Sequence, residues 1–368
     1  MKKFLIFVPN LQGGGAEKVA INLSNILAKD KCVVYLMFLK KNGLNINYLN
    51  KNINFINLNK QRLLFSIFLI INFLFKNKKN LNIISFLNAP NLLFCFIKFL
   101  FRLKNINLTI TIHNSVSDSY KNSNLKSKII IFLLKYFNGS ANKIICVSKY
   151  VKKDLINTWK LKNKNIYTIY NPAINVKEIN NLSKKKNFLL EKYKLKNFKI
   201  ILSAGRLTKQ KNYQLLLNAF YEVTKVIQDT ILIILGVGEL KESLIKLVQN
   251  KGLKKKVIFM GFQKNPYNFI KYSDLIVLSS DWEGLPTILI ESLYLKKKIV
   301  STNCNGGCSE VLKNGKYGYL VPMNDVNCLK KKIIFALNNK NKKLDRKYLD
   351  TFTDKFALKK YKSLILKN

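Results

Sequence analysis

The chain has few acidic residues, histidines and arginines, and these shortages limit the sites it can build. Its 368 residues include 19 Asp and Glu against 65 Lys and Arg, which gives a formal net charge of +46 at pH 7. No Asp-x-Asp pair occurs, so the carboxylate pair that commonly holds a divalent metal against a phosphorylated ligand is missing. Histidine occurs once, at His113, and arginine occurs only at Arg62, Arg102, Arg206 and Arg346.

The cysteines do not form a recognisable metal-binding or disulfide pattern. All six are scattered without a Cys-x-x-Cys pair, and the closest two, Cys304 and Cys308, have only His113 as a possible histidine partner. This pattern excludes a zinc site and favours free thiols in a reducing cytoplasm. The first apolar run stops at Pro9 and a glycine-rich loop follows, so we expect a first strand there rather than a signal peptide.

The excess of positive charge consists almost entirely of lysine, and it has two interpretations. Asn, Ile, Phe and Tyr are also abundant, and all of these residues have AT-rich codons, so the charge can reflect genome composition. Alternatively, the charge attracts a polyanion, either an anionic membrane surface or a nucleic acid. Specific nucleic-acid recognition depends on arginine forks and stacked aromatic rings. The scarcity of arginine therefore favours the membrane.

Two apolar segments of the first half, residues 63–75 and 92–101, lie among basic residues. Neither reaches the roughly 20 residues that a helix needs to span a bilayer. Each is either a buried core helix or a helix that lies in the membrane interface with lysines around its apolar face. The lysine excess favours the second interpretation, which predicts a peripheral protein on the cytoplasmic, inner face of the plasma membrane.

The first half of the chain alternates buried strands with amphipathic helices. An apolar strand is expected at residues 3–8, a helix at 16–27 after the glycine-rich loop, and a second strand at 32–39. Further strands are expected at 82–87, 108–112 and 143–147. A strand–loop–helix–strand opening of this kind predicts a parallel sheet with helices on both faces.

The second half repeats the scheme, from a strand at residues 199–205 to another at 298–302. The sequence therefore predicts an α/β protein with two doubly wound, Rossmann-like domains that face each other across a cleft. The expected divisions are an N-terminal domain at residues 1–171, a linker rich in Lys and Asn at 172–197, a C-terminal domain at 198–346 and a crossover helix at 347–368.

The most informative segment is Glu-Gly-Leu-Pro-Thr-Ile-Leu-Ile-Glu, from Glu283 to Glu291. Pro286 is expected to be the first residue of a helix, with Glu291 one to two turns along it. A helix N-terminus beside a glycine turn suits a phosphate, and a carboxylate one turn further in can accept hydrogen bonds from paired hydroxyls such as those of a ribose. The alternative is a capped surface helix with two solvated acids.

A basic turn follows the first strand of the second half. Arg206 and Lys211 lie five positions apart in Gly-Arg-Leu-Thr-Lys-Gln-Lys-Asn, at the edge where parallel sheets bind ligands. The planar fork of arginine and the point charge of lysine together suit a diphosphate. Such a set neutralises an anionic leaving group without a metal. A basic turn without a ligand is the alternative, and it is less favoured at Arg206 because arginine is so rare.

Three weaker signals mark other strand ends. The run from Gly13 to Gly15 lacks the third glycine of a dinucleotide-binding fingerprint, but its backbone can approach a ligand closely. Gly236-Val-Gly238-Glu239 follows another strand and forms either a platform for a flat base or a simple turn. His113 follows the strand at 108–112, where it faces the ligand edge or has a structural role.

Taken together, these motifs resemble a retaining glycosyltransferase of family four, which has the two-domain GT-B architecture. They run in the family's order over nearly the whole chain. The bacterial members that build lipid-linked oligosaccharides, lipooligosaccharide or capsule from UDP-sugars are the most similar. The matching residues are Gly14-Gly15-Ala16-Glu17, His113, Val147-Ser148, Asn171-Pro172, Gly205-Arg206-Leu207 with Lys211-Asn212, Gly236-x-Gly238-Glu239, and Glu283-Gly284-Leu285-Pro286 with Glu291.

The resemblance implies a role for each catalytic residue. Arg206 and Lys211 hold the donor diphosphate and stabilise the leaving group, while Glu283 orients the transferred sugar and His113 touches that sugar from the other domain. The implied mechanism is front-face attack with the leaving phosphate as base, and it is favoured over Glu283 as a covalent nucleophile. Residues implied to bind the donor are Gly14, Gly15, Gly205, Gly238, Glu239, Gly284, Leu285 and Glu291, the last through the ribose hydroxyls.

The expected activity is transfer of a hexose or N-acetylhexosamine from a UDP-sugar to a lipid-bound glycan at an anionic membrane surface. No metal or other cofactor is expected, and no nucleic-acid partner. The loop at residues 303–308, Asn-Cys-Asn-Gly-Gly-Cys, departs from the Asp-Cys-Pro-Ser-Gly-Pro-like loop of related enzymes beside the donor. Two alternatives are an epimerase of sugar nucleotides on the same architecture and a basic nucleic-acid-binding protein.

Overall fold

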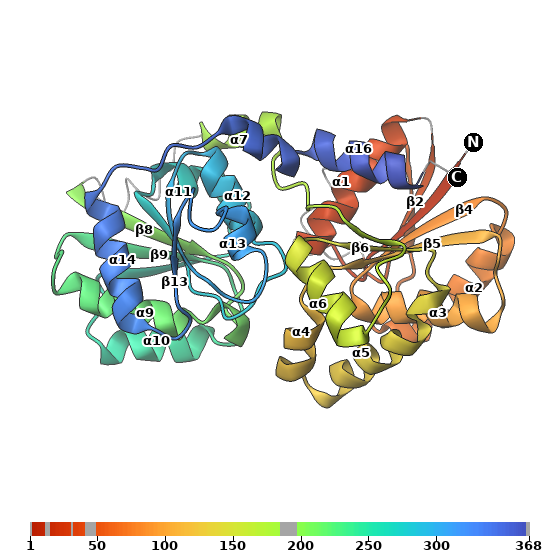
Figure 1. Ribbon diagram of the computed structural model, residues 1–368, viewed down its shortest axis with the longest axis horizontal. Helices are drawn as coiled ribbons and strands as arrows, with labels where there is room; N and C mark the ends of the chain where they lie inside the picture. The colour runs from red at the N-terminus through yellow and green to blue at the C-terminus, as the bar shows by residue number, and fades with distance from the viewer. Residues whose placement is uncertain (1, 12–14, 31, 41–48, 185–196, 366–368) are drawn as a thin grey trace. The chain divides into compact units, whose positions relative to one another are not determined.

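A computed structural model describes residues 2–11, 15–30, 32–40, 49–184 and 197–365. The chain forms two compact units: residues 1–172 with 354–368, and residues 173–353. The chain therefore crosses between the units twice, after Pro172 and after Thr353. Each unit has its own parallel sheet and its own hydrophobic core (Figure 1).

The first unit contains a seven-stranded sheet in the order β3-β2-β1-β4-β5-β6-β7, and all its pairings are parallel. Its central strands are short apolar segments whose residues are nearly all buried, as expected for a sheet covered on both faces. The strands are β1 Lys3–Phe7, β2 Val33–Phe38, β3 Ile53–Asn57, β4 Leu81–Phe86, β5 Ile106–Ile112, β6 Lys143–Cys146 and β7 Ile166–Thr168.

Helices cover both faces of this sheet. Helix α1 (Gly15–Lys29) and the C-terminal helix α16 (Asp354–Ile365) share one core, in which Ala357 and Tyr361 pack with β1 and β2 residues. On the other face lie α2 (Ile67–Lys76), α3 (Asn88–Leu100) and α5 (Leu125–Phe137), as Figure 1 shows. The remaining helices are η2 Leu63–Ser66, α4 Val116–Asn122, η3 Asn138–Ser140 and α6 Lys149–Trp159.

The second unit contains a six-stranded parallel sheet in the order β10-β9-β8-β11-β12-β13. The order reverses direction between β8 and β11, and ligands bind beyond the carboxyl ends of the strands at such a point. The strands are β8 Lys199–Ala204, β9 Thr230–Leu235, β10 Val257–Gly261, β11 Leu275–Leu278, β12 Lys298–Thr302 and β13 Tyr319–Val321.

Helices flank this second sheet as well. Apolar residues of α9 (Tyr213–Thr224), α10 (Lys241–Asn250) and α14 (Val326–Asn338) form one core with the strands. Figure 1 shows α11 (Tyr267–Tyr272), α12 (Thr287–Tyr294) and α13 (Cys308–Val311) on the opposite side. Shorter elements are α7 Val176–Ser183, η5 Lys209–Lys211, α15 Arg346–Leu349 and η6 Asp350–Phe352.

The predicted strands and helices agree with the structure to within a few residues, and the omissions have a common cause. The unpredicted strands β3, β7 and β13 all lie at sheet edges. Edge strands are partly exposed, so their sequences lack the continuous apolar run that marks a buried parallel strand. Pro286 is an N-cap with extended ψ of 97°, so the prediction that it is the first helical residue is wrong by one position.

The stretch predicted as a linker, residues 172–197, contains helix α7, which packs in the second unit. Its Leu182 carbonyl accepts a 2.9 Å hydrogen bond from Asn265 Nδ2, and residues 185–196 lie outside the described ranges. At the chain's end, α16 packs on the first unit, whereas the preceding segment from Arg346 to Thr353 stays with the second. None of the helices in the described ranges has the length and apolar character that crossing a bilayer requires.

Candidate functional site

The predicted residues of the second half lie where the strands of the second sheet end. Gly205 and Arg206 follow β8, Gly236 to Gly238 follow β9, and Glu283 follows β11. Because all these strands are parallel, their carboxyl ends meet at one edge of the sheet. The structure therefore brings the motifs together, although as many as 78 residues separate Gly205 from Glu283 in the sequence.

A buried ion pair joins two of these motifs. The ammonium group of Lys211 contacts Oε1 of Glu283, and the two side chains are only 14% and 7% exposed. The same Oε1 accepts a 2.6 Å hydrogen bond from the hydroxyl of Ser280, which is fully buried. The sequence predicted separate roles for Lys211 and Glu283, and the structure shows that the two side chains form an ion pair with each other.

Gly205 makes room for the stem of Lys211. A Cβ at position 205 would lie 3.1 Å from Cε of Lys211, tighter than side chains ordinarily allow. The carbonyl of Gly205 also accepts a 3.3 Å hydrogen bond from the buried Tyr213 hydroxyl. The glycine after β8 thus positions the cation rather than only turning the chain.

The Gly236-Val237-Gly238 motif serves close contact between two loops. Gly236 has φ of +134°, and a Cβ there would lie 1.9 Å from the Gly205 carbonyl oxygen. A Cβ at Gly238 would lie 2.3 Å from the carbonyl oxygen of Leu207. At both glycines, the backbone of the basic turn fills the space that a Cβ would need. The motif therefore packs directly against that turn and holds it in place.

The loop at residues 303–308 supports Glu283 in a similar way. The Glu283 amide donates to the Asn305 carbonyl at 2.8 Å. Gly306, at φ of +133°, has no room for a Cβ, which would lie 1.9 Å from the Glu283 carbonyl oxygen. The neighbouring thiols of Cys304 and Cys308 are buried and 3.5 Å apart. The loop that departs from the family pattern is thus the one that fixes the backbone of Glu283.

Glu291 and Leu285 lie around the start of α12. Glu291 is the fifth residue of that helix, one turn from its N-terminus, and it is buried with 6% exposure. Leu285 is also buried and lies in the loop before the helix, next to Gly284. The carboxylates of Glu283 and Glu291 are therefore both inside the protein, and the alternative of two solvated acids is wrong.

Arg206 and Glu239 are exposed, in contrast to the buried carboxylates of Glu283 and Glu291. Neither side chain forms an ion pair or hydrogen bond with any residue that the structure describes. Arg206 is therefore an available guanidinium next to the buried Lys211, at the end of β8. Its five N–H donors suit a ligand phosphate.

Sequence reasoning missed the polar residues that brace this edge. Asn212 Nδ2 donates to Asp281 Oδ1 at 2.8 Å, and Gln210 Nε2 donates to the Trp282 carbonyl at 2.9 Å. Burial raises the pKa of Asp281, against the opposing hydrogen bond from Asn212. The available signal was the polar run Ser279-Ser280-Asp281-Trp282 directly after a buried strand, which is a typical place for site residues.

His113 lies in the first unit, directly after β5 as predicted. Its Nε2 is 3.0 Å from the hydroxyl of Thr111, and its ring lies 5.4 Å from the ring of Phe86. Desolvation lowers the pKa of His113 to about 4, so the imidazole is neutral at neutral pH. Gly15 is the exposed first residue of α1, at the same edge of that sheet, while Gly14 lies outside the described residues.

The chemistry available at the second edge is anion binding with positioned carboxylates. This edge offers two cations, Lys211 held in an ion pair and Arg206 exposed to solvent. It also offers loops whose glycines leave the backbone accessible, and the N-terminus of α12. Within the described ranges, no group of three or more His, Cys, Asp and Glu side chains is arranged to hold a metal ion.

Models of known families match both halves of the chain. Residues 185–349 match the family described as glycosyl transferases group 1, and residues 13–173 match glycosyltransferase family 4. Each match covers one predicted half, and the first includes the basic turn, Glu283 and Glu291.

Two relatives extend this result. An uncharacterised glycosyltransferase of Methanocaldococcus jannaschii is 41% identical over 56% of this chain, and the chain spans only 51% of that protein's length. A Campylobacter jejuni protein is 31% identical over 89% of this chain and 88% of its own length. Its name is N-acetylgalactosamine-N,N'-diacetylbacillosaminyl-diphospho-undecaprenol 4-alpha-N-acetylgalactosaminyltransferase.

A solved structure has the same fold. The HepE protein of Anabaena, crystallised in complex with UDP-glucose, aligns with a TM-score of 0.76 over 99% of this chain and 96% of its own. The sequence identity is 17%, so the likeness concerns the fold.

We predict that Gly236→Ala destabilises the second unit by more than Gly252→Ala. Both glycines have positive φ, but only Gly236 faces a backbone oxygen at its Cβ position, and nothing lies within 4 Å of Gly252. Gly252→Ala should cost about 1 kcal/mol from the left-handed backbone alone, and Gly236→Ala about 2–3 kcal/mol or more. Urea unfolding of both variants measures the difference, and equal costs would contradict the tight contact between the two loops.

The single histidine allows a direct test of its environment. The ring of His113 should titrate near pH 4 in a proton NMR experiment on the folded protein, compared with about 6.5 in the unfolded chain. Because the pKa of His113 is lower in the folded protein than in the unfolded chain, the unfolded chain binds more protons between about pH 4 and 6.5. The contribution of His113 to the free energy of unfolding is therefore complete above about pH 6.5 and declines as the pH falls toward 4. A midpoint near 6.5 in the folded protein would show that the ring is solvated.

Proposed function

Since this chain belongs to the group 1 glycosyltransferases and has a family 4 N-terminal half, we propose that it transfers a hexose or N-acetylhexosamine from a UDP-sugar to a membrane-anchored glycan. The acceptor is a lipid-linked oligosaccharide, a lipooligosaccharide or a capsule precursor. Neither a sugar-nucleotide epimerase nor a nucleic-acid-binding protein finds support among the comparisons.

The observation that carries the proposal is the cationic turn held beside two buried carboxylates. Lys211 is fixed next to Glu283, and Arg206 is available at the same strand end. A diphosphate needs two or more positive groups at short range, and these two residues supply them. The buried Glu291, one turn into α12, supplies the acceptor for ribose hydroxyls. UDP-glucose in the structurally similar HepE supports a donor of this class.

The proposed reaction retains the configuration of the anomeric carbon. The acceptor hydroxyl attacks that carbon from the face that the diphosphate leaves, and its proton passes to the departing phosphate oxygen. Arg206 and Lys211 stabilise the negative charge that grows on this phosphate. Glu283, held by Ser280 and Lys211, orients the sugar, and His113 contributes a neutral imidazole.

The donor site is proposed to work without a metal or any other cofactor. In this proposal, Arg206, Lys211 and the N-terminus of α12 neutralise the negative charge of the diphosphate in place of a divalent ion.

The acceptor proposal draws on the relatives and on the surface of the first unit. The Campylobacter protein acts, by its name, on a glycan attached to diphospho-undecaprenol. The name of a second Campylobacter jejuni relative, 27% identical over 93% of this chain, also specifies a PP-undecaprenol acceptor. An enzyme of such acceptors works at a membrane surface.

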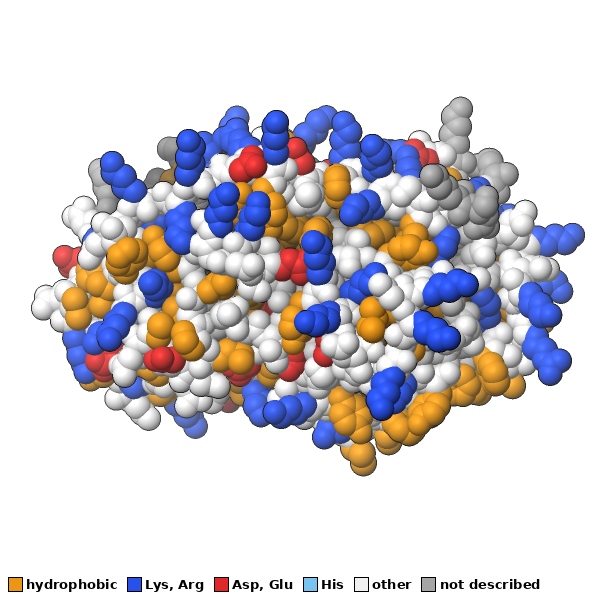
Figure 2. All heavy atoms as spheres, in the orientation of Figure 1, with side chains coloured by type: hydrophobic (Ala, Val, Ile, Leu, Met, Phe, Trp, Pro, Cys, Tyr) orange, Lys and Arg blue, Asp and Glu red, His pale blue; other side chains and the backbone are white. Residues whose placement is uncertain are grey.

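A continuous apolar patch covers the outer face of η2, α2, α3 and α5. Edge-on ring contacts of 5.4 Å link Phe75 of α2 to Phe101 beyond α3, and Phe99 of α3 to Phe137 of α5. Figure 2 shows a run of hydrophobic side chains along the lower edge of the molecule, where Figure 1 has these helices. The exposed members are Leu64, Phe65, Phe68, Leu69, Phe75, Phe96, Phe99, Leu100, Phe101, Leu125, Ile129, Phe132, Leu133 and Tyr136.

The exposure of α2 supports the interpretation of residues 63–75 as a helix in the membrane interface. Only Ile70 and Leu74 of α2 are buried, whereas Phe68 is 78% exposed, so α2 is not a core helix. Between Asp30 and Asp154 the sequence has a single acidic residue, Asp118, so the many lysines of this part of the chain are almost unopposed. An apolar face in a lysine-rich part of the chain suits the interface of an anionic membrane, and we propose that the enzyme works on the inner face of the plasma membrane.

Loss of the donor cations or of the ribose carboxylate should abolish transfer. We expect Arg206→Ala and Glu291→Ala each to lower kcat/KM by about 10²–10³-fold, because each removes a contact to the donor or its leaving group. The assay is UDP release from a panel of UDP-sugars with an undecaprenyl diphosphate-linked N-acetylhexosamine as acceptor, with and without EDTA.

The matched control for this experiment is Lys209→Ala, an exposed lysine in the same turn. It should retain activity, and thermal unfolding should show that all variants are folded. Wild-type transfer by Arg206→Ala and Glu291→Ala would refute the site, and loss of wild-type activity in EDTA would refute metal independence.

Membrane binding should depend on the apolar patch. The double change Phe68→Asp and Phe132→Asp should reduce co-sedimentation with phosphatidylglycerol-rich vesicles at least tenfold, since each buried phenylalanine contributes about 2 kcal/mol. Phe73, which packs edge-on against Tyr35 at 5.2 Å, is unsuitable for this test because its loss would disturb the fold.

Phe262→Asp is the control, since Phe262 is 46% exposed but lies in the second unit. It should bind vesicles like the wild type. Equal binding by the double variant would contradict a membrane role for the patch, and equal binding of the wild type to neutral phosphatidylcholine vesicles would contradict the role of the lysines.

A further inference from the structure

The second unit contains a cavity of about 750 Å³ that is separate from the donor site. Tyr294 to Lys297, which line it, connect the end of α12 to the start of β12, and Tyr317 precedes β13. The cavity is therefore at the amino ends of the strands, whereas the basic turn and Glu283 lie at the carboxyl ends. Its volume falls in the range of small-molecule sites.

Two walls of the cavity are the segments where the chain enters and leaves this unit. Ile174 and Val176 follow the first crossing, and Arg346 to Thr353 precede the second. These segments are tied together: the amides of Ala173 and Ile174 both donate to the Phe352 carbonyl, at 3.0 and 3.1 Å. A ligand in the cavity would contact both crossing segments at once.

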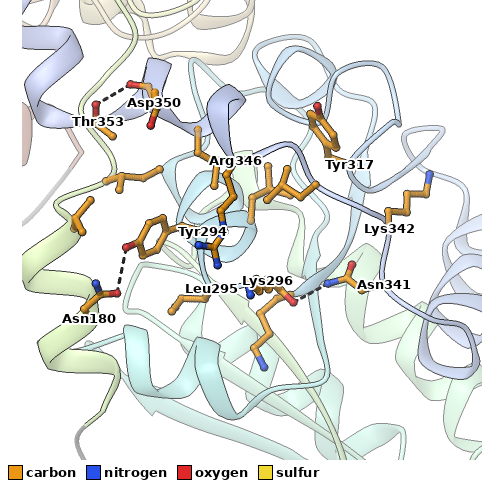
Figure 3. Close-up of a pocket in the computed structure, with 16 residues that line it drawn as sticks. Asn180, Tyr294, Leu295, Lys296, Tyr317, Asn341, Lys342, Arg346, Asp350 and Thr353 are labelled. Carbon is orange, nitrogen blue, oxygen red and sulfur yellow. Dashed lines mark hydrogen bonds between the residues drawn. The ribbon is translucent and has the colours of Figure 1, made fainter.

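Arg346 provides the cavity with a free guanidinium. Figure 3 shows its side chain extending from α15 toward Tyr294 and Leu295, away from the carboxylate of Asp350. No residue that the structure describes forms an ion pair or hydrogen bond with it. Only four of the 65 basic residues are arginines, so an arginine in this cavity is less easily explained by the general excess of lysine.

Two of the three other cations that line the cavity already have hydrogen-bond partners. Lys297 Nζ donates to the Ser273 carbonyl at 2.9 Å, and Lys342 Nζ donates to the Gly318 carbonyl at 3.0 Å. Desolvation lowers the pKa of both ammonium groups. Lys296 is exposed and offers only a point charge, so Arg346 is the one cation of the lining that can bind an anion through a planar fork.

Polar residues such as Asn341 and Asp350 also line the cavity, but a large part of its wall is apolar or aromatic. Leu293, Leu295, Leu344 and Leu349 contribute to the wall, together with the ring of Tyr294. The Tyr294 hydroxyl donates to Asn180 Oδ1 at 3.1 Å, which fixes the ring against α7 (Figure 3). Such a wall suits the hydrocarbon body of a ligand rather than a fully polar one.

We propose that this cavity binds an amphipathic organic anion, with its phosphate or carboxylate on Arg346 and its aromatic or aliphatic body against Tyr294 and the leucines. The site is distinct from the donor site, and it does not depend on the identity of the donor or acceptor. Because the bound anion contacts both crossing segments, its affinity depends on their conformation. If donor binding changes that conformation, donor and anion change each other's affinity by the same factor.

The test uses the full chain saturated with UDP, so that the donor site is occupied. Phenyl phosphate and 3-phenylpropionate are titrated by calorimetry and by saturation-transfer NMR, with inorganic phosphate and phenol as the separate halves of the ligand. At least one of the two amphipathic anions should bind with Kd of about 1 mM or below. Inorganic phosphate and phenol should each bind at least about tenfold more weakly.

Arg346→Gln should weaken binding of the anion at least about tenfold, since a charged hydrogen-bond pair is lost. Lys347→Gln removes one charge from the same short helix outside the cavity and should leave binding unchanged. Absence of binding by both anions up to about 10 mM in the UDP-saturated chain, or equal binding to Arg346→Gln, would each overturn the proposal. Preference for the phosphate or for the carboxylate tells which head group the site takes.

Discussion

The buried pair of Lys211 and Glu283 is the interaction on which the rest of the donor edge depends. It joins the turn after β8 to the loop after β11, and the backbone of the 303–308 loop then fixes Glu283 from behind. Removing one partner of a buried pair leaves an uncompensated charge and typically costs about 3–5 kcal/mol. The lack of a Cβ at Gly205, Gly236 and Gly306 allows the loops of this edge and the Lys211 side chain to pack in close contact.

The pair also balances the positive charge of this turn. Glu283 neutralises Lys211, and Arg206 is exposed, so its charge is hydrated. In the proposed mechanism, the diphosphate of the donor shares Lys211 with Glu283 and binds Arg206. The hydrogen bond from Ser280 gives the Glu283 carboxylate a second partner, so this carboxylate would not be left unpaired.

Most of the fold could be predicted from the sequence because buried parallel strands are continuous apolar runs with sharp ends. The edge strands β3, β7 and β13 could not be predicted, since partial exposure dilutes that pattern. The motifs identified which strand ends gather at the site. They did not reveal that Lys211 pairs with Glu283, or that Gly236 and Gly238 serve loop packing, because both depend on contacts between residues distant in sequence. The exposure of α5 and the cavity at Arg346 likewise follow from tertiary structure alone.

The most direct test of this account is a crystal structure of the protein with UDP. The account predicts the diphosphate against the Gly205–Leu207 turn, with Lys211 Nζ between the β-phosphate and Glu283, Arg206 ordered on the phosphate, and the ribose hydroxyls on Glu291. A diphosphate bound away from Lys211, with the Lys211–Glu283 pair unchanged and Arg206 still in solvent, would contradict it.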